Sequence, residues 1–427
     1  LREWMVEAAR LGELREVSGA SWQQDIGQAT ELLSHEESAP CVVFKDIPGT
    51  LPGSRVLVNF FGGQRQKMTL GFPTHLNKLE LSEAFRVHYM AELKRIPPKF
   101  VNDGPIFENV LTGDQIDVTQ FPTPQWHEPD GGRYIGTGSF NITRDPDEGW
   151  INCGTYRVMI HDRNTAGFYI SPGKHGRIIM TKYHERGQKC PVAVVVGMHP
   201  ALFMLSGIEV PYGMSEYDMG GGILGEAVEV INMPKTGIPV PANAEIAFEG
   251  FIAPDDKILE GPFGEWTGYY SGEARPEPVI RIETLMHRNN PILLGAIPGV
   301  PPNDNTFYFG AYRCGAVWNQ LEAAGIPGVQ AVAAHESGGS RFWLTVSIKQ
   351  MYGGHSKQAG MIAAACHAGA FNNRWTVVVD DDIDPFNIND VIWAMCTRVE
   401  ATEDLEIIKG GWSSALDPMC YEYDSDR

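Results

Sequence analysis

The stretch from residue 115 to 310 constrains the fold most, because it divides into many short β-rich runs separated by glycine and proline turns. The runs are GSFNITRD, INCGTYRVMIHD, CPVAVVVGMHP, AEIAFEGFIAP, PVIRIETLMH and PILLGAIPG. Short strands at this spacing are typical of a barrel or a sandwich. We therefore expect one of these β architectures in the middle of the chain.

Both flanks of this stretch mix helical and strand-like segments. Before it, apolar residues at helical spacing precede strand-like CVVFKDI (41–47) and SRVLVNFFG (54–62), followed by an amphipathic segment that stops at Pro97 and Pro98. After it, helical WNQLEAAG, SKQAGMIAAACHAGAF and NDVIWAMCTRVE alternate with strand-like FWLTVSIKQ and WTVVVDDDI. At roughly 150 residues per domain, the length also favours several domains. We predict an N-terminal α/β domain over 1–112, a central β domain over 113–310 and a C-terminal α/β domain over 311–427.

Charge and composition exclude several classes of partner. Acidic residues outnumber basic ones by 53 to 34, which gives a formal net charge of −19, and such a surface repels nucleic acid. No run approaches the roughly 18 to 20 apolar residues that span a bilayer, and the charged start is unlike a secretory leader. Seven scattered cysteines without a CxxC spacing argue against a disulfide framework or a structural zinc site. We therefore expect a cytoplasmic protein with reduced thiols and no membrane contact.

The segment from residue 151 to 177 places several polar side chains in otherwise strand-like sequence. Asn152 and His175 each offer one neutral ligand atom, and Arg157 lies between them. A carboxylate from elsewhere would complete a site suited to Mn²⁺ or Mg²⁺, and such a metal could anchor a phosphate. Taken alone, a histidine at this position is more typical of a surface or core residue than of a ligand.

A second segment, LEGPFGEWTGYY (259–270), carries Glu260 and Glu265 on either side of a Pro-Phe-Gly turn. Positions five apart on an ideal strand face opposite ways, but the turn can bring both acids to one cavity. With Arg157 between them, one glutamate would stay ionised while the other, more buried, would have a raised pKa and deliver a proton. The residues alone favour the alternative, a surface loop whose acids are solvated.

A third segment, YGGHSKQAGMIAAAC (352–366), begins a predicted helix with Ser356 and Lys357 after two glycines. The first turn of a helix attracts phosphate through its free N–H groups, and a lysine adds positive charge. The GxxxxGK[ST] pattern of a P-loop is absent, so this is not a nucleotide site of that kind.

Taken together, these segments resemble the UbiD family of reversible decarboxylases, which use prenylated FMN. The similar segments, in family order, are NxGxYR at 152–157, YISPGKHGR at 169–177, EGPFGEWTGYY at 260–270, YGGHSKQ at 352–358 and DDDIDPFNINDVIWA at 380–394. The resemblance implies an N-terminal α/β domain, a central split β-barrel of the flavin-reductase kind that holds the cofactor, and a C-terminal α/β domain. That layout agrees with the division proposed from the pattern of elements.

The resemblance also implies roles for individual residues. Asn152, His175 and Glu216 match the ligands of a divalent metal, Mn²⁺ or Mg²⁺ with K⁺ nearby, that links the protein to the cofactor phosphate. Arg157, Glu260 and Glu265 match the catalytic residues of the family. The positions that match cofactor contacts are Thr155, Tyr156, Arg157, Ser171, Pro172, Gly173, Gly176, Arg177 and Lys357.

The implied reaction is loss of CO₂ from an aromatic or heteroaromatic acid, in which a flavin supplies the electron sink that no side chain provides. Arg157 would orient the carboxylate, Glu265 would protonate the carbon, and Glu260 would hold Arg157. Candidates for the pocket wall are Trp266, residues 297–302 and residues 413–418. We also expect a flavin prenyltransferase as cofactor supplier, and a homodimer or homohexamer. Two alternatives remain open: a flavin reductase on the same barrel, and a non-catalytic subunit of a decarboxylase complex.

Overall fold

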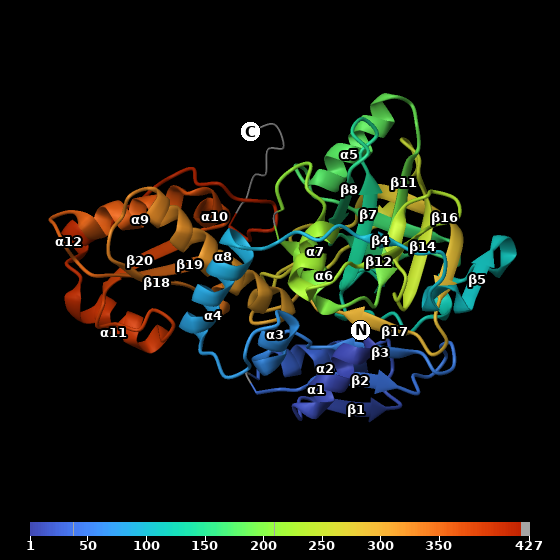
Figure 1. Ribbon diagram of the computed structural model, residues 1–427, viewed down its shortest axis with the longest axis horizontal. Coiled ribbons are helices and arrows are strands. Elements are labelled where there is room, and N and C mark those ends of the chain that lie inside the picture. Colours follow the sequence, from blue (N-terminus) through green and yellow to red (C-terminus); the bar gives the residue numbers. More distant parts are fainter. Residues whose placement is uncertain (37, 209, 420–427) are drawn as a thin grey trace.

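The computed structural model describes residues 1–36, 38–208 and 210–419. Figure 1 shows three parts: a small N-terminal layer, a large sheet with its covering helices, and a C-terminal part beside them. The N-terminal layer and the central sheet share two large apolar cores, whereas the C-terminal part has separate ones.

The N-terminal layer is a four-stranded sheet with helices. Its elements are α1 (Arg2–Arg10), β1 (Leu14–Ser18), α2 (Asp25–Ser34), β2 (Cys41–Lys45), β3 (Arg55–Val58), α3 (Gly63–Thr69) and β17 (Ile292–Gly295). The strand order is β1-β2-β3-β17. The two strands predicted at 41–47 and 54–62 are confirmed, because their β-branched side chains fill both faces of the sheet. β17 comes from the PILLGAIPG run, which the sequence pattern grouped with the middle domain, and pairs parallel with β3.

An extended connection leads from this layer into the central sheet. Its elements are α4 (Lys78–Phe85), the π-helical turn η1 (Arg86–Ala91), β4 (Lys99–Phe100) and the 3₁₀ turns η2 (Pro105–Glu108), η3 (Gly113–Gln115) and η4 (Val118–Gln120). The predicted helix before Pro97 is present, but its helical residues end at Ala91 and do not continue to the proline. It begins at a capping box between Asn77 and Glu80, which satisfies two free N–H groups of the first turn.

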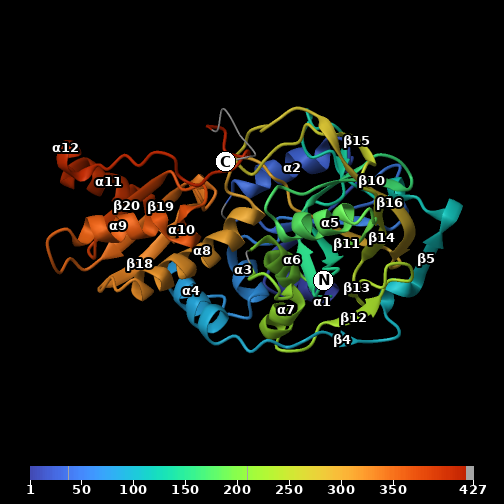
Figure 2. The ribbon, with the colours of Figure 1, turned by 90° about the horizontal axis from the view of Figure 1, so that it is seen from above.

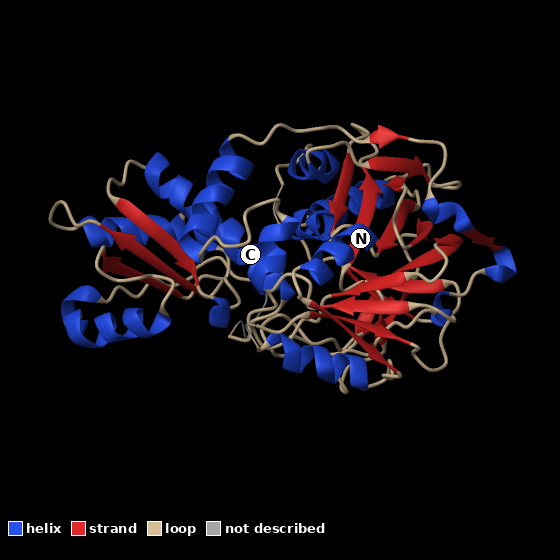
Figure 3. Cartoon of the chain, turned by 60° about the horizontal axis from the view of Figure 1, so that its bottom comes forward, coloured by secondary structure: helices blue, strands red, loops and turns tan. Residues whose placement is uncertain are grey.

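The central sheet has ten strands and is antiparallel throughout. Its strands are β5 (Asn109–Thr112), β6 (Arg133–Tyr134), β7 (Ser139–Arg144), β8 (Ile151–Gly154), β9 (Arg157–Ile160), β10 (Thr165–Tyr169), β11 (Cys190–Val196), β14 (Ile246–Ile252), β15 (Lys257–Glu260) and β16 (Arg275–His287). The order is β6-β9-β10-β16-β14-β11-β7-β8, with β5 and β15 also on β16. Figure 3 shows this curled half-barrel on the side of the molecule opposite the C-terminal sheet. The predicted split-barrel fold is confirmed.

Both faces of the central sheet are buried, and β11 shows why the sequence allows it. Its CPVAVVV run is apolar at successive positions instead of alternating. Val192, Val194 and Val196 join one core, whereas Ala193 and Val195 join the core on the opposite face. The latter face is covered by α6 (Pro200–Gly207) and α7 (Glu216–Leu224), whereas α5 (His175–Glu185) contacts β7, β8 and β11 and adds Met180 to the other core. Nearby, β12 (Glu229–Asn232) pairs with both β13 (Pro239–Pro241) and β4.

The C-terminal part is a three-stranded sheet with helices. Its elements are α8 (Asp304–Ala323), β18 (Val329–Ala334), the 3₁₀ turn η5 (Glu336–Gly338), β19 (Trp343–Ile348), α9 (His355–Ala365), α10 (His367–Ala370), β20 (Trp375–Asp380), α11 (Ile388–Arg398) and α12 (Ala401–Asp404). β18 is antiparallel to β19, and β19 is parallel to β20. The predicted C-terminal α/β fold is confirmed.

Several contacts cross the predicted domain boundaries at 112 and 310. β17 completes the N-terminal sheet, β5 pairs with β16, and α4 packs on α8, which begins before residue 310. The division into 1–112, 113–310 and 311–427 therefore stays a prediction of the sequence pattern.

Two expectations from the sequence concern membrane-spanning helices and disulfide bonds. Within the part of the chain that the structure describes, no helix has the length and apolar composition needed to cross a bilayer. The six cysteines among the described residues are free thiols. Cys420 lies outside the described residues.

Candidate functional site

The structure brings Arg157, Glu260 and Glu265 together, although more than one hundred positions separate the arginine from either acid. Arg157 Nη2 lies 2.7 Å from Glu260 Oε2, and Arg157 Nη1 lies 2.9 Å from Glu265 Oε1. The side chain of Arg157 is 16% exposed, that of Glu260 1% and that of Glu265 10%. The residues alone favoured a surface loop with solvated acids, but in the structure both glutamates are buried.

Sheet pairing explains this meeting. Arg157 opens β9 opposite Tyr169, the last residue of β10, and β10 lies beside β16. Glu260 ends β15 opposite Arg275, the first residue of β16. These strand ends therefore lie at one edge of the sheet, and the loop that follows Glu260 carries Glu265 back toward Arg157.

The two glutamates have different surroundings. Burial raises the pKa of Glu265 to about 7, Arg157 opposes this effect, and Glu260 adds to it. Glu260 also accepts a hydrogen bond from the Tyr134 hydroxyl at 2.9 Å. Burial works against the charged form of Arg157, but the two carboxylates outweigh it and raise the pKa of the guanidinium. The arrangement thus holds one permanent cation beside an acid that exchanges its proton near neutral pH.

Aromatic rings enclose Arg157. Its guanidinium lies 4.3 Å from the ring centre of Tyr169 and 5.4 Å from that of Phe263. Phe263 in turn packs on Tyr134 with ring centres 4.0 Å apart. Sequence reasoning missed Tyr134 as a partner of Glu260. Tyr169 opens the quoted YISPGKHGR segment, but only the strand register shows that it faces Arg157.

The three predicted metal ligands lie on elements that meet at the end of β8. Asn152 belongs to β8, and its amide nitrogen lies 3.4 Å from the Tyr156 hydroxyl. Glu216 is the first residue of α7 and accepts a hydrogen bond from the Cys153 N–H at 2.7 Å. His175 opens α5, and the N–H of the next residue donates to the same Tyr156 hydroxyl at 3.0 Å. Tyr156 therefore links the segments that carry Asn152 and His175.

This set of donors suits a hard divalent cation. Burial raises the pKa of Glu216 to about 8, so the carboxylate lies where a cation would offset its desolvation. An amide oxygen, an imidazole nitrogen and a carboxylate are ligands that Mn²⁺ and Mg²⁺ accept. Within the described ranges, no group of three His, Cys, Asp or Glu side chains could hold a metal. A set that includes an asparagine lies outside that class of sites.

The predicted cofactor contacts follow one another along the same edge. Thr155 and Tyr156 connect β8 to β9, and Thr155 Oγ1 lies 2.5 Å from Ser206 Oγ. Residues 171–174 form a turn between β10 and α5, with Gly173 at φ 82°. A side chain at residue 176 would meet the Tyr156 ring at 2.7 Å, so Gly176 allows this close approach.

One predicted cofactor contact lies elsewhere. Lys357 is on α9 and forms an ion pair with Glu406 at 2.8 Å, and Figures 1 and 2 place α9 far from α5. The structure therefore does not bring Lys357 to the other predicted residues. Among the pocket-wall candidates, Trp266 stacks on Phe342 at 5.0 Å, and Asp417 pairs with Arg374 at 2.6 Å in the C-terminal part.

Comparisons with known proteins agree on one family. Residues 99–301 match the 3-octaprenyl-4-hydroxybenzoate carboxy-lyase Rift-related domain (UbiD), and residues 307–425 match the C-terminal domain of the same carboxy-lyase. The chain is 32% identical over 418 residues to the pyrrole-2-carboxylic acid decarboxylase of Pseudomonas aeruginosa, covering 94% of this chain and 84% of that protein.

Two solved structures share the whole fold. The open form of vanillic acid decarboxylase from Sedimentibacter hydroxybenzoicus gives a TM-score of 0.88 at 27% identity, covering 98% of this chain and 88% of that one. An evolved dimeric form of the UbiD-class enzyme HmfF from Pelotomaculum thermopropionicum, in complex with prFMN, gives 0.85 at 25% identity, covering 99% of this chain and 96% of that one.

Proposed function

This chain belongs to the UbiD family of decarboxylases, and from that membership we propose that it releases CO₂ from an aromatic or heteroaromatic acid through Arg157, Glu260 and Glu265. The observation that carries the assignment of roles is the buried guanidinium held between two glutamates. Similar proteins act on pyrrole-2-carboxylic acid and vanillic acid, which supports a planar ring acid as the substrate class.

Arg157 orients the substrate carboxylate. Its two terminal nitrogens each serve one glutamate, while its buried Nε has no hydrogen-bond partner among the described residues. A guanidinium offers five N–H donors in a fixed plane, so donors remain for an incoming carboxylate. Glu260, held by Tyr134, keeps the guanidinium in place while the substrate enters.

Glu265 supplies the proton. When bound, prenylated FMN provides the electron sink that loss of CO₂ from an sp² carbon requires. The C–C bond to the carboxylate breaks and CO₂ leaves, after which the protonated Glu265 carboxyl gives its proton to the ring carbon. A pKa of about 7 suits this task, because the acid form is present at neutral pH and the proton is not held too tightly.

Asn152, His175 and Glu216 would hold Mn²⁺ or Mg²⁺, with K⁺ nearby, and the metal would fix the cofactor phosphate. The segments from 155 to 177 would contact the flavin beside Arg157. Lys357 stays a prediction as a phosphate contact, since in the structure Glu406 engages its ammonium group.

The proposal is tested by producing the protein with and without a flavin prenyltransferase and measuring CO₂ release from a panel that includes pyrrole-2-carboxylate and vanillate. We expect a prenylated-flavin absorbance spectrum and turnover only in the first preparation. Turnover without the prenylated flavin would reject the mechanism. NADH oxidation without CO₂ release would instead favour the flavin-reductase alternative. Light scattering on the same preparation tests the expected homodimer or homohexamer.

A further inference from the structure

We propose that Asp130 and Tyr270 are positioning residues that fix the loop carrying Glu265 and so set the rate of proton delivery. The sequence alone assigned no role to either residue, and the two lie 140 positions apart. The inference rests on the proposed function, because it takes Glu265 as the proton donor.

One oxygen of Asp130 binds both arms of the loop. Asp130 Oδ1 accepts a hydrogen bond from the Gly264 N–H at 3.0 Å and another from the Tyr270 hydroxyl at 2.9 Å. Gly264 directly precedes Glu265, and it also pairs with Tyr270 as an isolated β-bridge. The Asp130 side chain is fully buried. A single carboxylate therefore holds both ends of the segment from Gly264 to Tyr270.

Close backbone packing supports the same anchor. The Gly131 N–H donates to the Pro262 carbonyl at 2.8 Å, and a Cβ at Gly131 would lie 1.9 Å from the Gly261 carbonyl oxygen. Only a residue without a side chain allows the segment after Asp130 to lie this close to the start of the loop.

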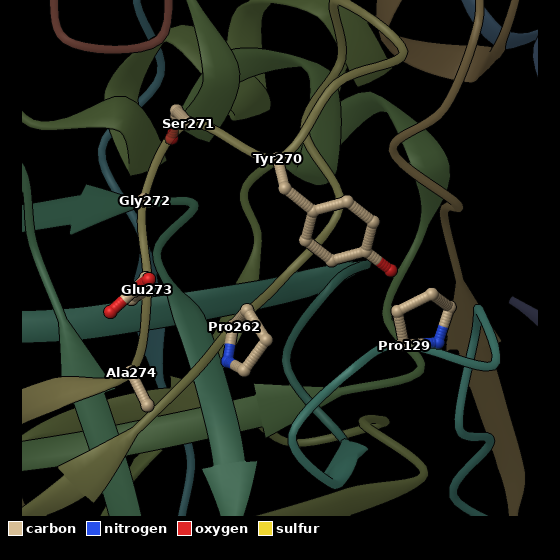
Figure 4. Close-up of a pocket in the computed structure, with 7 residues that line it drawn as sticks. All are labelled: Pro129, Pro262, Tyr270, Ser271, Gly272, Glu273 and Ala274. Atoms are coloured by element: carbon tan, nitrogen blue, oxygen red, sulfur yellow. The ribbon is translucent and has the colours of Figure 1, made fainter.

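The outer side of the loop is open. A cavity of 480 Å³ lies there, lined by Pro129, Pro262, Tyr270, Ser271, Gly272, Glu273 and Ala274. Figure 4 shows the Tyr270 ring directed across it toward Pro129, the residue before Asp130. Because an open cavity cannot hold the loop by packing, the bonds to Asp130 have to hold this side.

The charge of Asp130 is balanced locally. His127 Nδ1 lies 3.6 Å from Asp130 Oδ2, and His127 Nε2 lies 3.7 Å from Glu31 Oε2. Burial lowers the pKa of His127, but the two carboxylates outweigh it and raise the value to about 9, so the imidazole is charged at neutral pH. The Asp130 carboxylate also raises the pKa of Glu265, after the larger effects of burial, Arg157, Glu260 and Arg275.

Tyr270→Phe tests the anchor with the ring kept in place. Loss of one hydrogen bond of ordinary strength predicts a fall in kcat of about three- to tenfold, with KM for the acid changed by less than about twofold. Asp130→Asn also removes the negative charge that raises the pKa of Glu265. We therefore expect a larger fall in kcat, and a midpoint at lower pH when kcat is plotted against pH. Tyr269→Phe is the matched control, since Tyr269 is 61% exposed, and should leave kcat unchanged.

A second readout does not depend on turnover. In the flavin-free protein, amide hydrogen exchange in residues 261–272 should be faster in Tyr270→Phe and Asp130→Asn than in the wild type or in Tyr269→Phe. If Asp130→Asn does not fold, Tyr270→Phe still decides the question. Unchanged kcat and unchanged exchange in Tyr270→Phe would overturn the positioning role. An active Glu265→Gln enzyme would instead overturn the proposed function on which this inference rests.

Discussion

Glu260 and Glu265 bind the same guanidinium but are held by different kinds of structure. Glu260 ends strand β15 and has a second partner in the Tyr134 hydroxyl. Glu265 lies in the loop after that strand, where burial raises its pKa to about 7. A carboxylate fixed by a strand and two donors is suited to hold Arg157, whereas a buried acid on a loop is suited to give up a proton.

The largest effect should come from removing Glu265, the proposed proton donor. We expect Glu265→Gln to lower kcat by about 100- to 10,000-fold while the flavin stays bound, because general acid catalysis contributes that much. Stopped assays of CO₂ release and the absorbance of the bound flavin measure the two quantities. Glu260→Gln is the comparison, and it should keep more activity because the donor remains. Equal kcat in the wild type and Glu265→Gln would remove the distinction between the two acids.

Removing Arg157, the cation that both glutamates share, should lower the stability of the folded protein. Arg157→Gln leaves two buried carboxylates without their partner, and loss of one member of a buried ion pair costs about 3–5 kcal/mol. Urea unfolding at neutral pH measures this loss, and the deficit should shrink at lower pH as the Glu265 carboxylate becomes protonated. A variant as stable as the wild type at neutral pH would show that the pair is not buried as the structure has it.

The rate and the stability should both depend on the protonation of Glu265. Because the proposed role of Glu265 requires its acid form, kcat should fall about tenfold per pH unit above about 7. The pKa of Glu265 is raised in the fold from 4.5, so the folded state binds more protons, and its contribution to stability is lost as pH rises from 4.5 toward 7. The stability of Glu265→Gln should be less dependent on pH in this window, and an identical pH dependence would contradict the assignment.

The smallest effect should come from the second partner of Glu260. Tyr134→Phe removes one buried hydrogen bond, which is worth about 1 kcal/mol, and leaves the ring against Phe263. We expect a lower free energy of unfolding by that amount, with the pH midpoint of kcat unchanged. A shift of that midpoint would mean that Tyr134 acts on Glu265 as well as on Glu260.

Much of the fold could be predicted from local pattern, and the exceptions have physical causes. The strands at 41–47 and 54–62 and the helix before Pro97 follow from apolar spacing and from proline, which act locally. The run that forms β17 reads as a strand equally well in either sheet, because strand pairing between distant segments leaves no mark on the sequence. For the same reason, the register that sets Tyr169 opposite Arg157 could not be predicted.

In the candidate site, too, some residues could be predicted from the sequence and others could not. Arg157, Glu260 and Glu265 were chosen for their chemistry and their resemblance to a family, and the fold does bring them together. Tyr134, at the end of the two-residue strand β6, and Asp130, in the loop before it, were missed, because a single tyrosine or aspartate carries no spacing signal. Lys357 was chosen for a helix N-terminus and a charge, but those local features do not determine where the helix lies, and in the structure Glu406 engages it.

Proton transfer to carbon tests the central claim most directly, and it can be followed by decarboxylating a ring acid in D₂O and measuring deuterium in the product. With the wild-type enzyme, each product molecule should carry one deuterium at the former carboxylate position. The product alone, incubated with enzyme in D₂O without CO₂, should also exchange the hydrogen at that ring carbon for deuterium. This exchange should be fast in the wild type and Tyr269→Phe and absent in Glu265→Gln. Exchange in Glu265→Gln at the wild-type rate would show that another group delivers the proton.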